Sequence, residues 1–388
     1  MKVAIFGVEE VSQVLAQIIN NHYNLWLKQR MGEPLDVVAH VVRGGVITPD
    51  IGRLGNAAIL NPIQFAALYH KKLIDKIIFP RELCISQQPM LSYLQALDVD
   101  IDDIYITERL SENNTVINFL EPYIVSKYLP YLEFHVADHC NMNCKYCEHY
   151  SGLVRTPKFT DLKRFTRDLE QLHKFIDDIG TIRILGGEPL LNPEVGEYVK
   201  LCRRLYPFAN IFVVTNAILL PKMPDEFFET LKENNAGIHI SFYPPLASKM
   251  PAIKKMLAEK GVYVGVGDEP AKIFTIKQTL KRHNHKREVF LQCFQAHCHN
   301  IYEGKIGACF LPFTTKYFNE YYGKDLPEDG ALDLYENGLT TEKLKRFLLT
   351  PFERCSYCTP PVAAKWDTVS YPSPITDWTN DHLAEFKI

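Results

Sequence analysis

The chain has 388 residues, which is enough for two or three domains with a sizeable buried core. Its formal net charge is −3 and its basic residues are scattered, so we expect neither nucleic acid nor an anionic membrane surface as a partner. No stretch approaches the roughly 20 apolar residues of a membrane span, and Glu9 and Glu10 argue against a signal peptide.

The sequence contains 10 cysteines. In a chain with no secretion signal, this number favours metal or redox chemistry over a disulfide framework. We therefore expect a cytoplasmic protein, because the cell interior keeps thiols reduced.

Residues 1–125 alternate short apolar strands with helical patterns. We expect strands at Lys2–Phe6, Asp36–Val42, Asp75–Phe79 and Asp103–Thr107. This alternation predicts a Rossmann-like α/β domain with parallel strands. In the turn after the first strand, Glu9 and Ser12 stand where a dinucleotide-binding fingerprint needs glycines. Docking of a partner or a carrier is therefore favoured over nucleotide binding.

The βα pattern continues over residues 126–292 with longer units. We expect strands at Tyr131–His135, Thr181–Leu185, Ile211–Thr215, Gly237–Phe242 and Gly261–Val266. Functional residues of such βα units lie just after the strands. Residues 293–388 differ, because helical periodicity is limited and five cysteines gather there: Cys293, Cys298, Cys309, Cys355 and Cys358. A metal centre would organise a small region of this kind.

Three cysteines, Cys140, Cys144 and Cys147, follow the strand Tyr131–His135 with the spacing C-x3-C-x2-C. Three thiolates can hold three irons of a [4Fe–4S] cluster and leave the fourth iron open to a small molecule. Four close cysteines would instead indicate a closed cluster or a structural zinc. Zinc binding or isolated reduced thiols remain the structural alternatives for this motif.

This spacing, with Tyr146 before the last cysteine, resembles the signature of the radical S-adenosylmethionine (radical SAM) superfamily. Some forty residues later, Gly186, Gly187 and Glu188 resemble the GGE motif of that family. The resemblance implies a partial (βα)6 TIM-like barrel over residues 126–292. It also implies S-adenosylmethionine as cofactor, bound on the open iron of the cluster.

The resemblance extends to further cofactor contacts. Tyr146, Asn216 and Ser241 are expected to contact S-adenosylmethionine together with the GGE segment. Tyr243, Asp268 and Glu269 are the candidates to touch substrate or to move a proton. The family's chemistry also implies a reducing partner such as flavodoxin or ferredoxin, which supplies the electron that releases a 5′-deoxyadenosyl radical.

Residues 297–309 read as a β-hairpin that turns at Glu303-Gly304. This turn would place Cys298 opposite Cys309. With Cys355 and Cys358, these thiols resemble the auxiliary-cluster extension of the SPASM or shorter twitch type, which implies one auxiliary [4Fe–4S] cluster in residues 293–388. The spacing of the resembling motif before its glycine fits Cys293 better than Cys298, whereas the hairpin geometry favours Cys298 as the ligand. A structural zinc at the four thiols stays open.

Taken together, these features predict a radical SAM enzyme. The expected substrate is a small polar molecule, a carbohydrate or a nucleotide-sugar-like metabolite, which the enzyme would oxidise or epimerise. One alternative is a maturase that modifies a ribosomally made peptide. A second alternative, of another class, is a non-enzymatic iron–sulfur protein for electron transfer or regulation.

Overall fold

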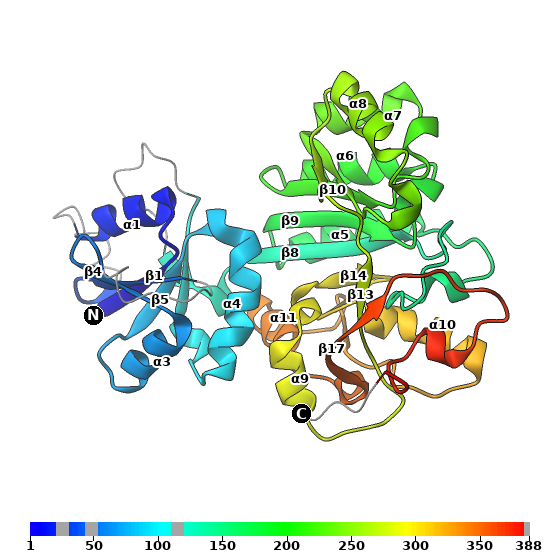
Figure 1. Ribbon diagram of the computed structural model, residues 1–388. Coiled ribbons are helices and arrows are strands. Elements are labelled where there is room, and N and C mark those ends of the chain that lie inside the picture. The colour runs from blue at the N-terminus through cyan, green and yellow to red at the C-terminus, as the bar shows by residue number, and fades with distance from the viewer. Residues whose placement is uncertain (21–30, 43–52, 110–119, 384–388) are drawn as a thin grey trace. The chain divides into compact units, whose positions relative to one another are not determined.

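The computed structural model describes residues 1–20, 31–42, 53–109 and 120–383 (Figure 1). The chain forms two compact units, one of Met1–Tyr131 with Thr340–Arg346, and one of Leu132–Leu339 with Phe347–Ile388. Both contain sheets with parallel strands, so the predicted mixed α/β class is confirmed. None of the described helices is long and apolar enough to cross a membrane.

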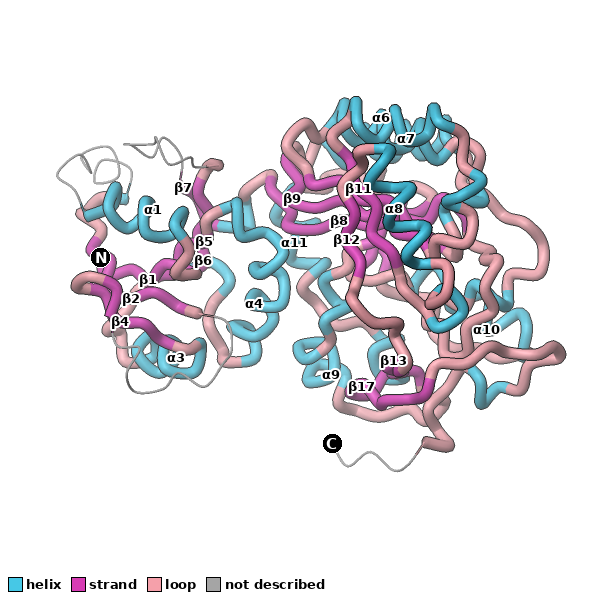
Figure 2. The backbone as a smooth tube through the Cα atoms, turned by 45° about the horizontal axis from the view of Figure 1, so that its top comes forward, coloured by secondary structure: helices cyan, strands magenta, loops and turns pink. Residues whose placement is uncertain are grey.

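The first unit is built on one sheet. Its strands are β1 (Lys2–Phe6), β2 (Asp36–Val41), β3 (Arg53–Leu54), β4 (Ala57–Leu60), β5 (Lys76–Phe79), β6 (Ile104–Thr107) and β7 (Leu120–Pro122). Its helices are α1 (Glu10–Asn20), α3 (Pro62–His70) and α4 (Cys84–Ala96). The strands lie in the order β3-β4-β2-β1-β5-β6-β7 (Figure 2). The four predicted strands of this segment are confirmed to within one residue.

Parallel pairing runs from β4 through β2, β1 and β5 to β6, whereas β3 and β7 pair antiparallel at the two edges. Helix α1 packs Leu15, Ile18 and Ile19 against Val3 and Ile5 of β1. These helix positions lie three or four residues apart, so they share one face and bury it against the sheet.

The second unit contains a longer βα series. Its strands are β8 (Tyr128–Ala137), β9 (Asp178–Gly186), β10 (Asn210–Thr215), β11 (Ala236–Ile240), β12 (Val264–Val266), β13 (Ile273–Gln278), β14 (Asn300–Tyr302), β15 (Lys305–Gly307), β16 (Ala331–Asp333) and β17 (Cys358–Lys365). Its helices are α5 (Leu162–His173), α6 (Val195–Leu205), α7 (Asp225–Glu233), α8 (Met250–Lys260), α9 (Lys286–Gln292) and α10 (Leu311–Tyr322). Helix α11 (Thr341–Leu348) contributes residues to both units.

Eight strands form the main sheet of this unit, in the order β12-β11-β10-β9-β8-β14-β15-β16. The five predicted strands of the central segment are present as β8 to β12, and helices α5 to α8 alternate with them along the chain (Figure 1). The series departs from six consecutive βα strands, because β13 leaves this sheet and pairs antiparallel with β17. The C-terminal segment provides that partner strand.

The predicted hairpin is confirmed. Strands β14 and β15 pair antiparallel, with Asn300 opposite Gly307. The two turn residues, Glu303 and Gly304, have φ values of 48° and 79°. Positive φ at both positions is characteristic of the type I′ turn, whose twist suits a two-residue hairpin. Strand β14 also pairs parallel with β8, which joins the C-terminal segment to the central sheet.

Candidate active site

The three cysteines of the C-x3-C-x2-C motif line one cavity beside the strand ends. Its volume is about 150 Å³. The lining residues come from the cysteine loop and from the segments at and after β9, β10 and β11: Cys140, Met142, Cys144, Cys147, His149, Ser151, Leu185, Gly186, Gly187, Val214, Thr215, Asn216, Ser241, Tyr243 and Phe274. The structure therefore brings the two predicted motifs together at the expected edge of the sheet.

The glycines of the second motif allow the end of β9 to approach the backbone of the cysteine loop closely. The N–H of Gly187 donates to the carbonyl oxygen of Ala137 at 2.8 Å, and the N–H of Glu188 donates to that of His139 at 3.1 Å. A Cβ atom on Gly186 would collide with the Ala137 carbonyl, and one on Gly187 with the His139 carbonyl. These two positions need glycine because the cysteine loop lies directly against them.

Glu188 supports the site from behind the cavity wall. Its side chain is fully buried, and its carboxylate accepts hydrogen bonds from Thr215 Oγ1 at 2.6 Å, Asn216 N at 2.9 Å and Leu190 N at 3.1 Å. Burial raises the pKa of this carboxyl to about 7, although the three hydrogen bonds oppose the rise. Glu188 does not line the cavity. Its carboxylate instead connects the end of β9 to the end of β10 through the hydrogen bonds from Thr215 and Asn216.

Asn216 and Ser241, which are predicted to contact S-adenosylmethionine, line the cavity. Asn216 Nδ2 lies 2.7 Å from Asn141 Oδ1 and 3.8 Å from Cys140 Sγ. The N–H of Met142 also points to Cys140 Sγ, at 3.4 Å. Two N–H donors on this sulfur fit a metal-bound thiolate, because hydrogen bonds to the sulfurs are a regular feature of iron–sulfur sites.

Other predicted residues are placed less directly. Tyr243 lines the cavity, whereas Asp268 and Glu269 are exposed and line neither it nor the neighbouring cavity beside Trp366. The side chain of Tyr146 is buried away from the cavity, with its ring stacked on His382 at a centroid distance of 6.3 Å. Tyr146 has a φ of 64°, so the backbone turns at this residue, directly before Cys147.

The sequence-based prediction missed a chain of polar groups behind the cavity. His149 lines the cavity, and its Nδ1 lies 2.7 Å from His135 Nε2. His135 Nδ1 lies 3.2 Å from Asp138 Oδ1, and Tyr302 donates to Asp138 Oδ2 at 2.8 Å. Burial alone would raise the pKa of Asp138, but hydrogen bonds and the charge of His135 lower it to about 2. Both histidines flank the cysteine motif, a signal the sequence did offer.

Trp366 was also missed. Its ring stacks on Tyr243 at a centroid distance of 5.8 Å, and its buried indole N–H interacts with the Cys144 thiol. The pKa of Cys144 is raised to about 12 by burial and by the neighbouring Cys147 thiol, with the Trp366 indole opposing. Trp366 thus lies beside Cys144, although it comes 222 residues later in the chain, directly after β17.

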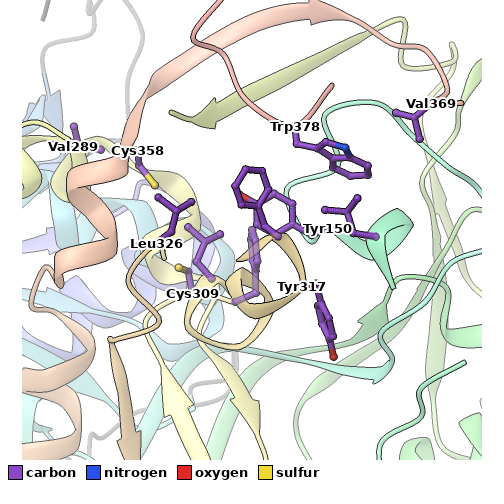
Figure 3. Packing of buried hydrophobic residues seen from close by; sticks show 12 residues of the cluster. Tyr150, Val289, Cys309, Tyr317, Leu326, Cys358, Val369 and Trp378 are labelled. Carbon is purple, nitrogen blue, oxygen red and sulfur yellow. The ribbon is translucent and has the colours of Figure 1, made fainter. Parts of the chain in front are cut away.

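A second group of thiols forms in the C-terminal segment, and it differs from the favoured prediction. The Cys309 thiol interacts electrostatically with Cys293, Cys355 and Cys358. Cys355 and Cys358 each interact with Cys293 as well. Cys309 and Cys358 belong to one buried cluster, as Figure 3 shows.

Cys298 is not part of this mutual group. The Cys293 thiol is the cysteine that acts most strongly on Cys298, whose Sγ points to the Phe294 carbonyl oxygen at 3.9 Å. The hairpin register would place Cys298 opposite Cys309, but β14 begins only at Asn300. The preference for Cys298 over Cys293 assumed that the ladder continues to Cys298, and a short 3-10 helix over Phe294–His297 ends it earlier.

Neither thiol group has the geometry of a single-ion site. In the described parts of the chain, no set of three or more His, Cys, Asp or Glu side chains is close enough to hold one metal ion. A tetrahedral zinc needs its sulfurs about 2.3 Å from one centre. In an iron–sulfur cube each cysteine binds a different iron, so the sulfurs stand further apart.

The first thiol group lies in the part of the chain that is similar to known proteins. The sequence model of the Radical SAM superfamily matches residues 135–244, which include the three cysteines, the GGE segment, Asn216 and Tyr243. The chain contains a radical SAM domain. That domain supports an enzyme, as predicted.

The curated relatives match this same part of the chain. A GTP 3',8-cyclase of Listeria monocytogenes is 34% identical over 128 residues, which is 32% of this chain and 37% of the relative. A 7,8-dihydro-6-hydroxymethylpterin dimethyltransferase of Methanocaldococcus jannaschii is 35% identical over 101 residues, covering 25% and 19%. The chain spans less than half the length of these relatives.

Among solved structures, BtrN in complex with AdoMet and 2-DOIA aligns with 60% of this chain and 93% of its own, at 16% identity and a TM-score of 0.38. The complex of anSMEcpe with AdoMet and the Cp18Cys peptide aligns with 35% and 41%, at 16% identity and a TM-score of 0.28. These scores are too low to assign the fold of the whole chain.

Proposed function

We propose that this protein is a radical SAM enzyme that abstracts hydrogen from a small polar substrate, of the carbohydrate or nucleotide-sugar class. The observation that carries the proposal is the cavity in which Cys140, Cys144 and Cys147 meet the glycines of β9 and the polar residues after β10 and β11. A [4Fe–4S] cluster there, with S-adenosylmethionine bound, supplies a 5′-deoxyadenosyl radical on reduction. A flavodoxin or ferredoxin is the proposed electron donor.

Within this proposal, the chain's own residues position the cofactor and enclose it. Gly186 and Gly187 let the strand end approach the cysteine loop, and Glu188 holds the ends of β9 and β10 together. Asn216 and Ser241 provide polar groups at the cavity wall, and Tyr243 with Phe274 covers its apolar side. Fixed side chains of this kind orient a cofactor and exclude water from a reactive intermediate.

The proposal includes one auxiliary [4Fe–4S] cluster of the twitch type. Its ligands are Cys293, Cys309, Cys355 and Cys358, because these four thiols interact mutually. Two buried nitrogen donors support the fit. Gln278 Nε2 has no hydrogen-bond partner among the described residues, and β13 places Gln278 opposite Cys358. Lys277 Nζ contacts Glu148 Oε2 at 2.9 Å and has further protons to donate. Cluster sulfurs are acceptors that such donors can use.

The small-molecule class is favoured over a peptide by the names of the curated relatives, which refer to GTP and to a pterin. The strand order β4-β2-β1-β5-β6 supports a Rossmann-like first unit, for which docking of a partner or carrier is proposed. The nine described cysteines are free, which supports a reducing, cytoplasmic compartment.

The test is anaerobic reconstitution of the full chain with iron and sulfide, followed by dithionite and S-adenosylmethionine. We expect 5′-deoxyadenosine from the wild type and none from Cys140→Ala. A well-loaded wild type that yields no 5′-deoxyadenosine would leave the non-enzymatic electron-transfer alternative. Nucleotide sugars and short peptides are then compared for deuterium transfer into 5′-deoxyadenosine, and transfer from peptides alone would favour the peptide maturase.

A further inference from the structure

Arg354 is a buried cation without an acidic partner. Its side chain is fully buried, yet no described carboxylate forms an ion pair with it. Its guanidinium donates to four neutral oxygens, namely Gln278 Oε1 at 2.6 Å, Tyr150 Oη at 3.2 Å, Tyr357 O at 3.2 Å and Thr315 Oγ1 at 3.3 Å. A buried charge is costly unless an opposite charge compensates it.

The second set of thiols includes the neighbours of Arg354 in the chain, and the Arg354 charge acts on the Cys358 thiol. Arg354 precedes Cys355 in the chain, and Cys358 Sγ lies 3.8 Å from the Arg354 carbonyl oxygen. Gln278 connects the two, because its Oε1 accepts from Arg354 Nη2 and lies 4.0 Å from Cys358 Sγ. A cube held by four thiolates has a net negative charge, which is the compensation that Arg354 lacks.

A second buried cation stands on the same strand. Lys277 is 2% exposed, and its ammonium lies 2.9 Å from Glu148 Oε2. Gln295 Nε2 also donates to this carboxylate, at 2.8 Å. An ammonium has three protons, so beyond the contact with Glu148 the Lys277 side chain can still donate to a further acceptor. Lys277 precedes Gln278, the residue opposite Cys358.

We propose that Arg354, supported by Lys277, is the counter-charge of the auxiliary cluster and raises its reduction potential. The inference rests on the proposed function, which assigns the four thiols to that cluster. A buried positive charge stabilises the more negative, reduced form of a cluster, and the surrounding low dielectric keeps this effect from being screened. Arg354 is therefore a residue that tunes the cluster without binding it.

The test uses the full chain with Cys140, Cys144 and Cys147 all changed to Ala, so that only the auxiliary cluster contributes to the signal. The potential is measured by redox titration followed by electron paramagnetic resonance. Arg354→Gln is expected to lower the equilibrium constant for reduction at least tenfold, which corresponds to about 59 mV for a one-electron couple. Glu148→Gln, which removes a buried anion beside Lys277, is expected to shift the potential in the opposite direction.

Arg282→Gln is the matched control. The side chain of Arg282 is 53% exposed and pairs with Glu353, the residue before Arg354. Arg282→Gln therefore removes the same charge at a position where solvent screens it. The potential of this variant should stay within the error of the wild type. An Arg354→Gln variant that loads iron fully and keeps the original potential overturns the inference.

If Arg354→Gln fails to bind iron, the variant Arg354→Lys, which keeps the charge, separates an effect of the charge from a structural effect. If Arg354→Lys binds its full complement of iron and has the wild-type potential, the counter-charge is supported. If this variant binds no iron, or if its potential is lowered, the inference is overturned. If the parent triple variant itself binds no iron while the wild type carries one cube and cleaves S-adenosylmethionine, the auxiliary cluster and this inference both fail, and the radical SAM activity stands.

Discussion

The backbone N–H of Gly187 donates to the carbonyl oxygen of Ala137 at 2.8 Å. This bond joins the end of β9 to the end of β8, directly before the cysteine loop. The position of the three thiols therefore depends on how closely these two strand ends approach.

Gly187→Ala should open this contact. The new Cβ would collide with the His139 carbonyl oxygen, and overpacking of this kind costs about 1–3 kcal/mol. We expect a lower free energy of unfolding in denaturant titrations and less iron per chain after reconstitution. Gly196→Ala is the control, because a Cβ there has only ordinary contacts, the nearest at 3.5 Å, and lies within α6. Equal stability and iron content in both variants would contradict the role of Gly187.

Cys293 and Cys298 should differ in their effect on iron content. Cys293→Ala is expected to lose the auxiliary cluster and to keep the first one, since Cys293 interacts with Cys309, Cys355 and Cys358. Cys298→Ala should keep both clusters. Iron and sulfide analysis with Mössbauer spectroscopy measures this. If Cys298→Ala alone loses a cluster, the result would instead support Cys298 as the partner of Cys309, as the hairpin register predicts.

Thr215→Val should weaken the support around Glu188. The substitution removes the hydroxyl that donates to Glu188 Oε1 at 2.6 Å, and the buried carboxylate loses one of its three donors. The expected cost is about 1–3 kcal/mol, together with weaker binding of S-adenosylmethionine in equilibrium dialysis. Thr230→Val is the control, because this buried hydroxyl forms no hydrogen bond among the described residues. A similar loss of stability in both variants would mean that the effect of Thr215→Val comes from packing and not from the hydrogen bond to Glu188.

The first unit should lose stability in acid through Asp103. Burial alone would raise the pKa of this carboxyl, but hydrogen bonds from Tyr69 and Lys76 and the Lys76 charge hold the pKa below its usual range. A depressed carboxyl pKa contributes stability above the unfolded value of about 3.9, and the contribution disappears as the pH falls through the folded value.

Asp103→Asn should therefore be less stable than the wild type at pH 7, by about 1 kcal/mol, and the difference should shrink below about pH 4. Urea titrations at several pH values measure it. Glu259→Gln is the control, because Glu259 pairs only at 3.9 Å with Lys255 on the surface. A stability difference for Asp103→Asn that is independent of pH would assign the effect to packing.

Much of the local structure follows from the sequence alone. The strands and the hairpin at Glu303-Gly304 were predictable, because apolar alternation and turn chemistry depend on residues close together in the chain. The three-cysteine motif and the GGE segment were predictable for a related reason. Both follow strands of one sheet, and the ends of such strands meet at one edge.

Only the tertiary structure decided which distant groups meet. Cys293 and Cys298 are separated by four residues, and which of them joins Cys309 depends on where a short helix ends and a strand begins. No local pattern marks Arg354 as buried, yet it is fully buried and its guanidinium donates to Gln278 of β13, the residue opposite Cys358. The physical reason is that burial and charge pairing are properties of segments brought together by packing, and no local pattern encodes them.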